Sequence, residues 1–509
     1  MAKTKLDKDL KRLSRMTYGT RDLGKSLVPL GIGLLFLVVA GILAASQVGV
    51  SGVWAIAVGA TVIGAYMALN IGANDVANNM SPAVGSRSLT IGAALLIAAV
   101  AEGAGAIIAG GDVIETVSKG IIDPQRMPDT ATFVVAMISA LFAAALWVNL
   151  ATWLSAPVST THAVVGGVLG AGVAVAGVGV ANWTVVVGIV ASWVISPVMG
   201  GVIAAGFLAY LKHTVYDAPD RLPAAAKQVP LLMAVMVGSF TAYLMMKGLG
   251  QILPVSLGSA LLVGAVLGIP TFFLVRPQVE AKLAVAGTGA YSLGDLFTIP
   301  VIGGAALLSF AHGANDVANA IGPLAAIYAA LEGGVQGEEV RLPFWILLVG
   351  ALGISLGLAL FGPKLIRTVG SEITKLNRVR AFCVTLSAAI TVIVASALGL
   401  PVSSTHIAIG ALFGVGFLRE YLANRDGDPK TRGRIFRLRP PEMPPVTEGG
   451  SAEIEKLRKK AEKNRKRYLV RRSHVLTIGA AWIITVPCSA VLAMVLARLL
   501  LLLGLGELL

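Results

Sequence analysis

Apolar residues dominate the chain in long runs that polar positions interrupt at only a few places. Runs of about 20 apolar residues recur from residue 27 onward, and 56% of the 509 residues are hydrophobic. An α-helix needs about 20 such residues to cross the hydrocarbon core of a bilayer. The pattern therefore predicts an all-α integral membrane protein with about 12–13 transmembrane helices.

Composition supports close helix packing and argues against redox chemistry. The 59 glycines are interleaved with Ala and Ser, and small residues let membrane helices approach closely. Cys383 and Cys488 both lie in apolar stretches, so neither a disulfide framework nor a zinc cluster is expected.

Positive charge is concentrated in two segments. Eight Lys/Arg lie within residues 3–25 and seventeen within 419–472, of 41 in the chain. Cytoplasmic flanks of membrane proteins are enriched in Lys and Arg, so both segments are expected in the cytoplasm, and nucleic-acid binding is not. The apolar stretch 27–46 is too long for a signal peptide and is interpreted as an uncleaved first helix. Residues 453–472 fit either an amphipathic helix on anionic lipid or a solvated charged helix.

Two motifs occur twice. "IGANDVANN" (71–79) returns as "HGANDVANA" (312–320), and "SAPVSTTHAVVGGVLGAG" (155–172) returns as "GLPVSSTHIAIGALFGVG" (399–416). The chain is a tandem duplication. The predicted units are an N-terminal segment and extra helix (1–50), a first repeat (51–211), inter-repeat helices (212–291), a second repeat (292–418), a basic insert (419–472) and a final helix completing the second repeat (473–509).

Aligned loops of the two halves differ in the sign of their charge. "GGDVIETV" (110–117) aligns with "GPKLIRTV" (362–369), so that Asp112 becomes Lys364 and Glu115 becomes Arg367. Loops of opposite charge are expected on opposite sides of a membrane. We therefore expect an inverted-repeat transporter in the plasma membrane (a cell inner membrane), with the N-terminus and residues 419–472 cytoplasmic and the C-terminus external.

The motif N-D-x-x-N places two amides on one helix face with a carboxylate beside them. The residues are Asn74, Asp75 and Asn78 in the first copy, and Asn315, Asp316 and Asn319 in the second. Buried amides often only link helices to one another. Two carboxylates within apolar segments are costly, however, and usually mark an ion or substrate path.

The second motif predicts a helix that starts within the membrane. Pro157 and Pro401 interrupt what precedes them, and hydroxyl residues suited to helix capping follow: Ser159, Thr160, Thr161, Ser403, Ser404 and Thr405. Such a helix start attracts an anion, although membrane Ser and Thr residues often bond only to their own backbone. The symmetric duplication favours the anion site.

Hydroxyls and helix starts favour an anion, whereas two carboxylates would repel it unless a cation binds between them. Carboxylate, amide and hydroxyl oxygens suit Na⁺, and protonated carboxylates would suit a proton-coupled version. Coupled binding of this kind is the basis of symport.

With these paired motifs the chain resembles the inorganic phosphate transporter (PiT) family, over roughly residues 50 to 420 plus the final helix. The resemblance implies Na⁺- or H⁺-coupled uptake of inorganic phosphate, homodimers in the lipid bilayer, and no cofactor beyond the coupling ion. It implies phosphate binding by Asn74, Asn78, Ser159, Thr160, Thr161, Asn315, Asn319, Ser403, Ser404 and Thr405. It also implies cation binding, Na⁺ included, by Asp75, Asp316, Asn78 and Asn319. Asn79 departs from the family pattern, which has a small residue there.

Three further residues have open roles. Glu102 is the one carboxylate in the apolar run 88–111, and it would relay protons, bind a second cation or pair locally. His162 and His406 flank the hydroxyls, but each lacks Cys or carboxylate partners at metal-ligand spacing.

Other functions remain open at this point. A sulfate symporter would share the fold and the tetrahedral oxyanion. An intramembrane aspartyl enzyme would use Asp75 and Asp316 as a dyad, although no separate catalytic motif accompanies them. A passive anion channel is disfavoured by inverted repeats around a carboxylate-bearing site.

Overall fold

The computed structural model describes residues 5–48, 53–154, 156–251, 253–286, 292–332, 343–372, 376–425 and 472–508. Within these ranges the regular structure is helical, apart from one isolated antiparallel bridge between Ile122 and Ala181. The predicted class, an all-α membrane protein, is confirmed. Most of the basic insert (426–471) and of the acidic loop (333–342) lies outside the described residues.

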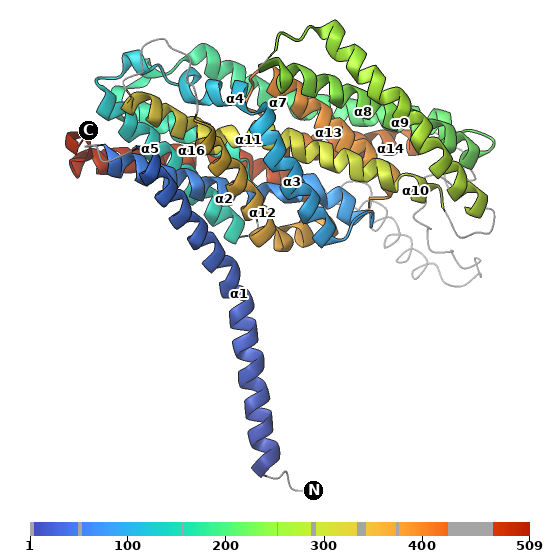
Figure 1. The fold of residues 1–509 in the computed structure, drawn as a ribbon, viewed down its shortest axis with the longest axis horizontal. Helices are drawn as coiled ribbons and strands as arrows, with labels where there is room; N and C mark the ends of the chain where they lie inside the picture. The colour runs from blue at the N-terminus through green and yellow to red at the C-terminus, as the bar shows by residue number, and fades with distance from the viewer. Residues whose placement is uncertain are drawn as a thin grey trace, which may run out of the picture.

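Figure 1 shows the helices in the order in which they follow one another along the chain. The N-terminal part contains α1 (Lys5–Val48), α2 (Trp54–Gly85), α3 (Ile91–Ala109), α4 (Gly111–Glu115), α5 (Thr130–Trp153), α6 (Thr160–Ala176), α7 (Trp183–Leu211) and α8 (Arg221–Lys247). The C-terminal part contains α9 (Leu257–Ala286), α10 (Leu293–Leu296), α11 (Thr298–Leu331), α12 (Phe344–Glu372), α13 (Arg378–Ala397), α14 (Ser404–Arg425) and α16 (Arg472–Leu502).

Ten helices in the described ranges are long and apolar enough to cross a membrane. They are α1, α2, α3, α5, α7, α8, α9, α12, α13 and α16. Helix α6 is apolar but has only 17 residues. Helices α11 and α14, which carry the second copies of the two motifs, lie in the same bundle without being among the ten.

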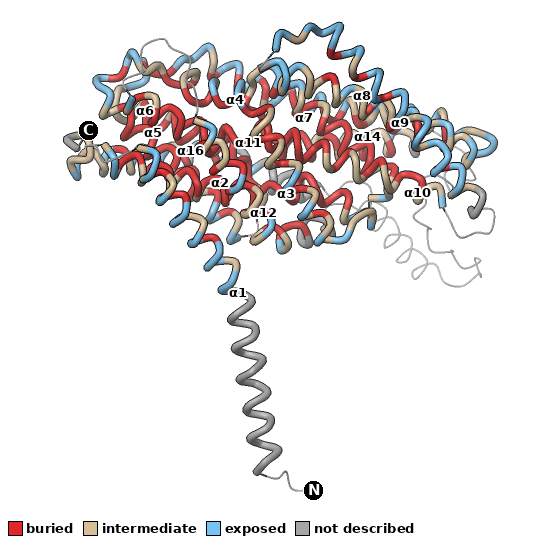
Figure 2. Tube along the Cα trace, viewed as in Figure 1, coloured by how far each residue is buried: buried red, intermediate tan, exposed pale blue. Residues whose placement is uncertain are grey.

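Burial is concentrated in the helices that carry the motifs. Figure 2 shows the buried residues gathered along α2, α5, α11 and α14, whereas residues 27–48 of α1 and much of α9 are exposed. The polar motifs therefore lie at the centre of the bundle, and the outer helices surround them.

Each half packs its helices against the other half. Helix α2 packs on α12, and its counterpart α11 packs on α3; likewise α6 packs on α16 and α14 on α7. The closest approaches occur at glycines: a Cβ atom added to Gly72 would lie 2.0 Å from the carbonyl oxygen of Ile354, and one added to Gly313 would lie 2.0 Å from that of Glu102. Only glycine allows the two backbones to approach this closely.

Candidate functional site

Both PVS motifs lie between two helices that are buried at the centre of the bundle. Helix α5 ends at Trp153 and α6 begins at Thr160, with Pro157 in the non-helical link between them. The hydroxyl of Ser159 caps α6 by accepting a 3.2 Å hydrogen bond from the backbone N–H of His162. A cap of this kind satisfies one of the N–H groups that a helix start leaves unpaired.

The second half repeats this arrangement. Helix α13 ends at Ala397, α14 begins at Ser404, and Ser403 accepts a 3.3 Å hydrogen bond from the N–H of His406. Gly399 has a φ of +66°, in the left-handed region that favours glycine, so the chain can turn there between the helices.

Asn74 fixes the non-helical link of the first half. Its side-chain amide donates to Thr152 Oγ1 at 2.9 Å and to the carbonyl of Ala156 at 3.3 Å. Its Oδ1 accepts a 3.3 Å hydrogen bond from the N–H of Val158. Both amide hydrogens are therefore used within the protein.

Asn315 makes the equivalent contacts in the second half. Its amide donates to Ser396 Oγ at 3.0 Å and to the carbonyl of Leu400 at 3.1 Å, and its Oδ1 accepts from the N–H of Val402 at 3.2 Å. The first Asn of each N-D-x-x-N motif thus satisfies backbone groups where helix hydrogen bonds are interrupted.

Each motif carboxylate accepts a hydrogen bond from the first hydroxyl of the capped helix. Thr160 donates to Asp75 Oδ2 at 3.0 Å, and Ser404 donates to Asp316 Oδ2 at 3.2 Å. All four residues are at most 3% exposed. Water therefore cannot compensate these carboxylates, and a buried ionised carboxylate requires a positive partner.

The second Asn of each motif reaches across to the other repeat. Asn78 donates to Asp75 Oδ1 at 3.1 Å and to Thr405 Oγ1 at 2.7 Å, and Thr405 also donates to Asp75 Oδ1 at 3.2 Å. The motif copies of the two halves therefore meet in one cluster, although Asn78 and Thr405 are 327 residues apart in the sequence.

Asn319 makes the reciprocal connection to the first repeat. It donates to Asp316 Oδ1 at 3.3 Å and to Thr161 Oγ1 at 3.1 Å, and Thr161 donates to the carbonyl of Val402 at 2.9 Å. Twelve motif residues are brought together in this way: Asn74, Asp75, Asn78, Ser159, Thr160, Thr161, Asn315, Asp316, Asn319, Ser403, Ser404 and Thr405. We call these twelve residues and His312 the central cluster.

His312 belongs to this cluster, and sequence reasoning missed it. Its Nε2 lies 2.7 Å from Asp316 Oδ2 and 3.8 Å from Asp75 Oδ2, and its ring is fully buried. In the described part of the chain, Asp75, His312 and Asp316 are the side chains whose ligand atoms converge as a metal site would require, all within 4.8 Å. The signal in the sequence was that His312 stands where the first motif copy has Ile71.

Glu102 contacts the cluster through His312. Its Oε2 lies 3.1 Å from His312 Nδ1, and its Oε1 accepts a 2.8 Å hydrogen bond from Asn79. All three side chains are 0% exposed. Of the three roles considered for Glu102, local pairing is present in this structure.

His162 and His406 lie beside the cluster and contact each other. Their rings are perpendicular, with centroids 4.4 Å apart, and the ring of Trp193 lies against His162 at a tilt of 44°, with centroids 3.8 Å apart. Neither histidine belongs to the group of ligand atoms that converge in the described residues. Aromatic packing accounts for their position.

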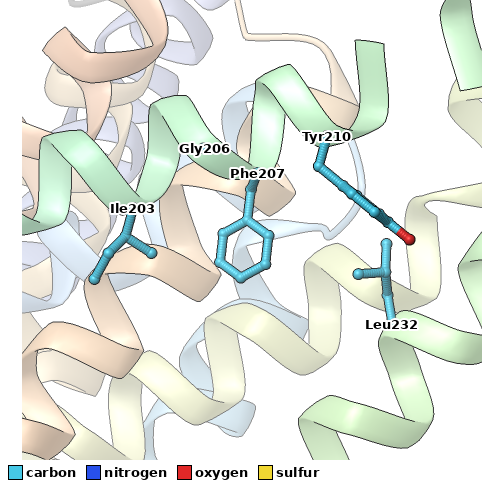
Figure 3. Close-up of a pocket in the computed structure, with 5 residues that line it drawn as sticks. All are labelled: Ile203, Gly206, Phe207, Tyr210 and Leu232. Carbon is cyan, nitrogen blue, oxygen red and sulfur yellow. The ribbon is translucent and has the colours of Figure 1, made fainter. Parts of the chain in front are cut away.

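An apolar groove lies away from the central cluster, between α7 and α8 (Figure 3). It has a volume of about 380 Å³ and is lined by Ile203, Gly206, Phe207, Tyr210 and Leu232. The lining carries no charged group, so this groove does not suit an ion.

Comparison with known proteins gives consistent matches. The model of the "Phosphate transporter family" matches residues 71–493. A protein of Helicobacter pylori strain J99 named "Putative phosphate permease" is 44% identical over 517 residues, covering 95% of this chain and 97% of that protein. "Inorganic phosphate transporter 2-1, chloroplastic" of Arabidopsis thaliana is 38% identical over 384 residues, covering 70% of this chain and 65% of that protein.

A solved structure described as "The sodium-dependent phosphate transporter" has the same fold. Its TM-score is 0.73 at 32% identity, and the match covers 88% of this chain and 99% of that one.

A helical bundle that crosses the membrane many times around a buried, charged cluster defines a membrane transporter, not an enzyme. The chain belongs to the phosphate transporter family. The family predicted from the paired motifs is confirmed, and the alternative of an intramembrane aspartyl enzyme is wrong.

Proposed function

We propose that this protein imports inorganic phosphate across the plasma membrane by symport with Na⁺, and that both ions bind at the central cluster. The observation that carries the proposal is the pairing of each motif carboxylate with a hydroxyl at a helix start, Thr160 with Asp75 and Ser404 with Asp316. Each pair joins an oxygen-rich cation position to a helix N-terminus that favours an anion.

The cation is needed because two buried carboxylates would repel phosphate. Na⁺ next to Asp75 would be coordinated by the carboxylate and by the hydroxyl oxygens of Thr160 and Thr405, all of which already meet there. The positive charge compensates the carboxylate and attracts the anion at short range in a low-dielectric site. Cation binding thus increases the affinity for phosphate, and the converse follows by linkage.

Hydroxyl groups would transmit this coupling. In the present arrangement the hydrogen of Thr160 points toward Asp75, so it is not available to a ligand. A cation bound between the carboxylate and the hydroxyl oxygen would displace this hydrogen bond. The hydroxyl could then donate to a phosphate oxygen, together with backbone N–H groups at the start of α6. The same sequence applies to Ser404 and α14.

Asn74 and Asn315 would act indirectly in this scheme. Their amide hydrogens hold the links before α6 and α14. They would therefore shape the phosphate site, while the hydroxyl residues, Asn78 and Asn319 contact the ions.

Na⁺ is our choice of coupling ion over H⁺ because the similar solved structure is described as sodium-dependent. Phosphate is our choice over sulfate because the family and its relatives carry that substrate in their names. Phosphate can also donate a hydrogen bond to a carboxylate, which sulfate cannot do at neutral pH.

The proposed orientation places the basic loops in the cytoplasm. Arg378 donates a 3.3 Å hydrogen bond to the carbonyl of Arg87, so the basic connections α2–α3 and α12–α13 lie at one end of the bundle. Asp112 pairs with Lys247, which also contacts the carbonyl of Ala397 at 3.2 Å. We propose that the first end is cytoplasmic and the second external, and that the protein is a homodimer, to be tested by cross-linking in membranes.

Transport by the purified protein in proteoliposomes tests the proposal. Labelled phosphate uptake is measured with an inward Na⁺ gradient, with an inward H⁺ gradient and with neither, and then with excess sulfate. We expect uptake that follows the Na⁺ gradient and is unaffected by sulfate. Uptake driven only by the H⁺ gradient would replace Na⁺ with H⁺, and competition by sulfate would broaden the substrate to tetrahedral oxyanions.

A further inference from the structure

The two repeats place their motif helices in equivalent surroundings. Gly72 in α2 approaches the carbonyl of Ile354 in α12, and Gly313 in α11 approaches that of Glu102 in α3, each with the same 2.0 Å distance for an added Cβ. Ile354 is therefore the spatial counterpart of Glu102. Within the motifs, His312 corresponds to Ile71 and Asn79 to Ala320.

Three polar residues of one repeat interface thus have three apolar counterparts at the other. Asn79, Glu102 and His312 form one continuous chain, with contacts of 2.8 Å and 3.1 Å. The counterparts Ala320, Ile354 and Ile71 are all 0% exposed, as the polar three are. The difference is therefore in chemistry and not in burial.

Packing does not require the polar chain. An amide, a carboxylate and an imidazole buried among membrane helices are costly compared with apolar side chains. The other interface packs the equivalent helices, α2 and α12, just as closely at its glycine contact, with two isoleucines and an alanine in place of the polar residues. We therefore expect the polar chain to have a function that offsets its energetic cost.

The polar chain of Asn79, Glu102 and His312 makes a close contact with only one of the two motif carboxylates. His312 Nε2 lies 2.7 Å from Asp316 Oδ2, against 3.8 Å from Asp75 Oδ2. Asp316 Oδ2 also accepts the hydroxyl of Ser404, so this oxygen has two close partners. A cation that binds through Oδ2 of Asp316 must displace the imidazole or share this oxygen with it, whereas a cation that binds through Oδ2 of Asp75 need not.

We infer that Asn79, Glu102 and His312 are positioning residues that make the two cation positions of the cluster unequal. Asn79 holds Glu102, Glu102 orients the ring of His312, and the imidazole of His312 contacts the carboxylate of Asp316. Asp75 with Thr160 and Thr405 is then the position of higher cation affinity, and Asp316 fills second. This inference rests on the proposed cation-coupled function and adds to it an order of binding.

The test replaces the three residues of the polar chain with the residue types found at the equivalent positions of the other repeat. The symmetrised variant is Asn79→Ala, Glu102→Ile, His312→Ile. Binding of radioactive ²²Na⁺ to purified protein is measured for Asp75→Asn and Asp316→Asn, each in the wild-type and in the symmetrised background. In the wild-type background, Asp75→Asn should weaken the tightest Na⁺ binding by about tenfold or more relative to Asp316→Asn, as for the loss of a well-supported ligand. In the symmetrised background the two should agree within about threefold, because both carboxylates then have the same surroundings.

Two outcomes overturn the inference. One is equal Na⁺ binding by Asp75→Asn and Asp316→Asn in the wild-type background; the other is a difference that persists after symmetrisation. Absence of any Na⁺ binding by the wild type would instead overturn the Na⁺ assignment of the proposed function, and the inference with it.

A second variant keeps the test decisive if the triple substitution does not fold. Glu102→Gln retains the shape and an oxygen that accepts from Asn79, so it should keep His312 in place and preserve most of the Asp75/Asp316 difference. Glu102→Ala should abolish that difference. Ile354→Val, at the apolar counterpart, is the packing control and should leave Na⁺ binding unchanged. Equal behaviour of Glu102→Gln and Glu102→Ala would contradict a positioning role.

Discussion

The side chain of Asn78 donates a 2.7 Å hydrogen bond to Thr405, and this bond joins the first GANDVAN motif to the second PVSSTH motif. Asn319 donates to Thr161 in the reciprocal direction at 3.1 Å. Each repeat therefore supplies an amide to the helix start of the other, and Asp75 also accepts a hydrogen bond from Thr405 of the second repeat at 3.2 Å. The ion site that we propose is therefore complete only where both repeats meet, which is also the usual place for the site of an inverted-repeat transporter.

Loss of either motif carboxylate should abolish coupled uptake without unfolding the protein. In Asp75→Asn or Asp316→Asn the cation loses its charged ligand, and phosphate is then no longer attracted to the site. Gradient-driven phosphate uptake in proteoliposomes measures the effect, and thermal unfolding in detergent checks the fold. Glu280→Gln, in an exposed ion pair with Arg276, is the matched control and should transport normally. Normal uptake by either aspartate variant would remove these residues from the site.

Loss of a single hydroxyl at a helix start should weaken phosphate binding. Thr160→Ala or Ser404→Ala should cost about 0.5–1.5 kcal/mol for one hydrogen bond, or roughly 1.5–3 kcal/mol if the acceptor is charged. That is on the order of threefold to a hundredfold in affinity. Valine at either position should weaken phosphate binding further, because its side chain also blocks the backbone N–H groups.

Phosphate titration by calorimetry, at high and at low Na⁺, provides the measurement. Thr271→Ala is the control, since the hydroxyl of Thr271 bonds only to the carbonyl of Leu267 in its own helix, among the interactions of the described residues. If both alanine variants at the site bind phosphate like the wild type, the hydroxyls have a purely structural role.

A methyl group at a close helix contact should destabilise the bundle. In Gly313→Ala the new Cβ would meet the carbonyl oxygen of Glu102 at 2.0 Å, so α3 and α11 must move apart. We expect a loss of about 1–3 kcal/mol, typical of overpacking. Gly188→Ala has no atom within 4 Å of its Cβ and should be neutral or slightly stabilising. Thermal unfolding of both in detergent makes the comparison, and equal melting temperatures would argue against this contact.

The opposite orientation of the repeats can be tested at two aligned positions. Cys383 and Cys488 are first replaced, and single cysteines are then introduced as Glu115→Cys and Arg367→Cys. An impermeant thiol reagent should label only position 115 in intact cells, and position 367 only after the membrane is opened. Labelling of both from the same side would refute the inverted repeat.

Acid should selectively remove the contribution that Asp295 makes to the stability of the folded protein. This residue lies outside the membrane-spanning helices. Its carboxylate accepts hydrogen bonds from the backbone N–H and the hydroxyl of Ser292 and pairs with Arg378. These partners, the Ser292 N–H first, hold the pKa of Asp295 below its usual range. A lowered pKa stabilises the folded state above the unfolded-state pKa of about 4, and this stabilisation disappears as pH falls through the folded-state pKa.

The melting temperature of the wild type should therefore exceed that of Asp295→Asn at pH 7, and the gap should close below about pH 4. Differential scanning calorimetry of both proteins in detergent, across this pH range, measures the difference in melting temperature. A gap that does not change with pH would mean that the charge of Asp295 contributes nothing.

Repetition made most of the central cluster predictable. The N-D-x-x-N and PVS motifs could be paired because each occurs twice, and a carboxylate within an apolar run indicates function by its cost alone. The role of Asn74 could not be predicted, since its amide partners, the hydroxyl of Thr152 and the carbonyl of Ala156, are more than 75 residues away in the chain. His312 was overlooked because its partner Glu102 lies on another helix. Alignment of the two halves pairs Glu102 with Ile354 and His312 with Ile71, but it does not reveal that Glu102 and His312 lie 3.1 Å apart.

The exchange of partners between the halves has a consequence for biosynthesis. Helix α2 ends at Gly85, and its partner α12 begins only at Phe344, roughly 260 residues later. At about 5–20 residues per second, α2 spends roughly 13 to 50 seconds in the membrane before its partner has been synthesised. During that interval Asp75 and Asn78 lack Thr405, their hydrogen-bond partner in the second repeat. The insertion machinery, or a temporary neighbour among the early helices, must shield this polar face from lipid until the ribosome completes the other half.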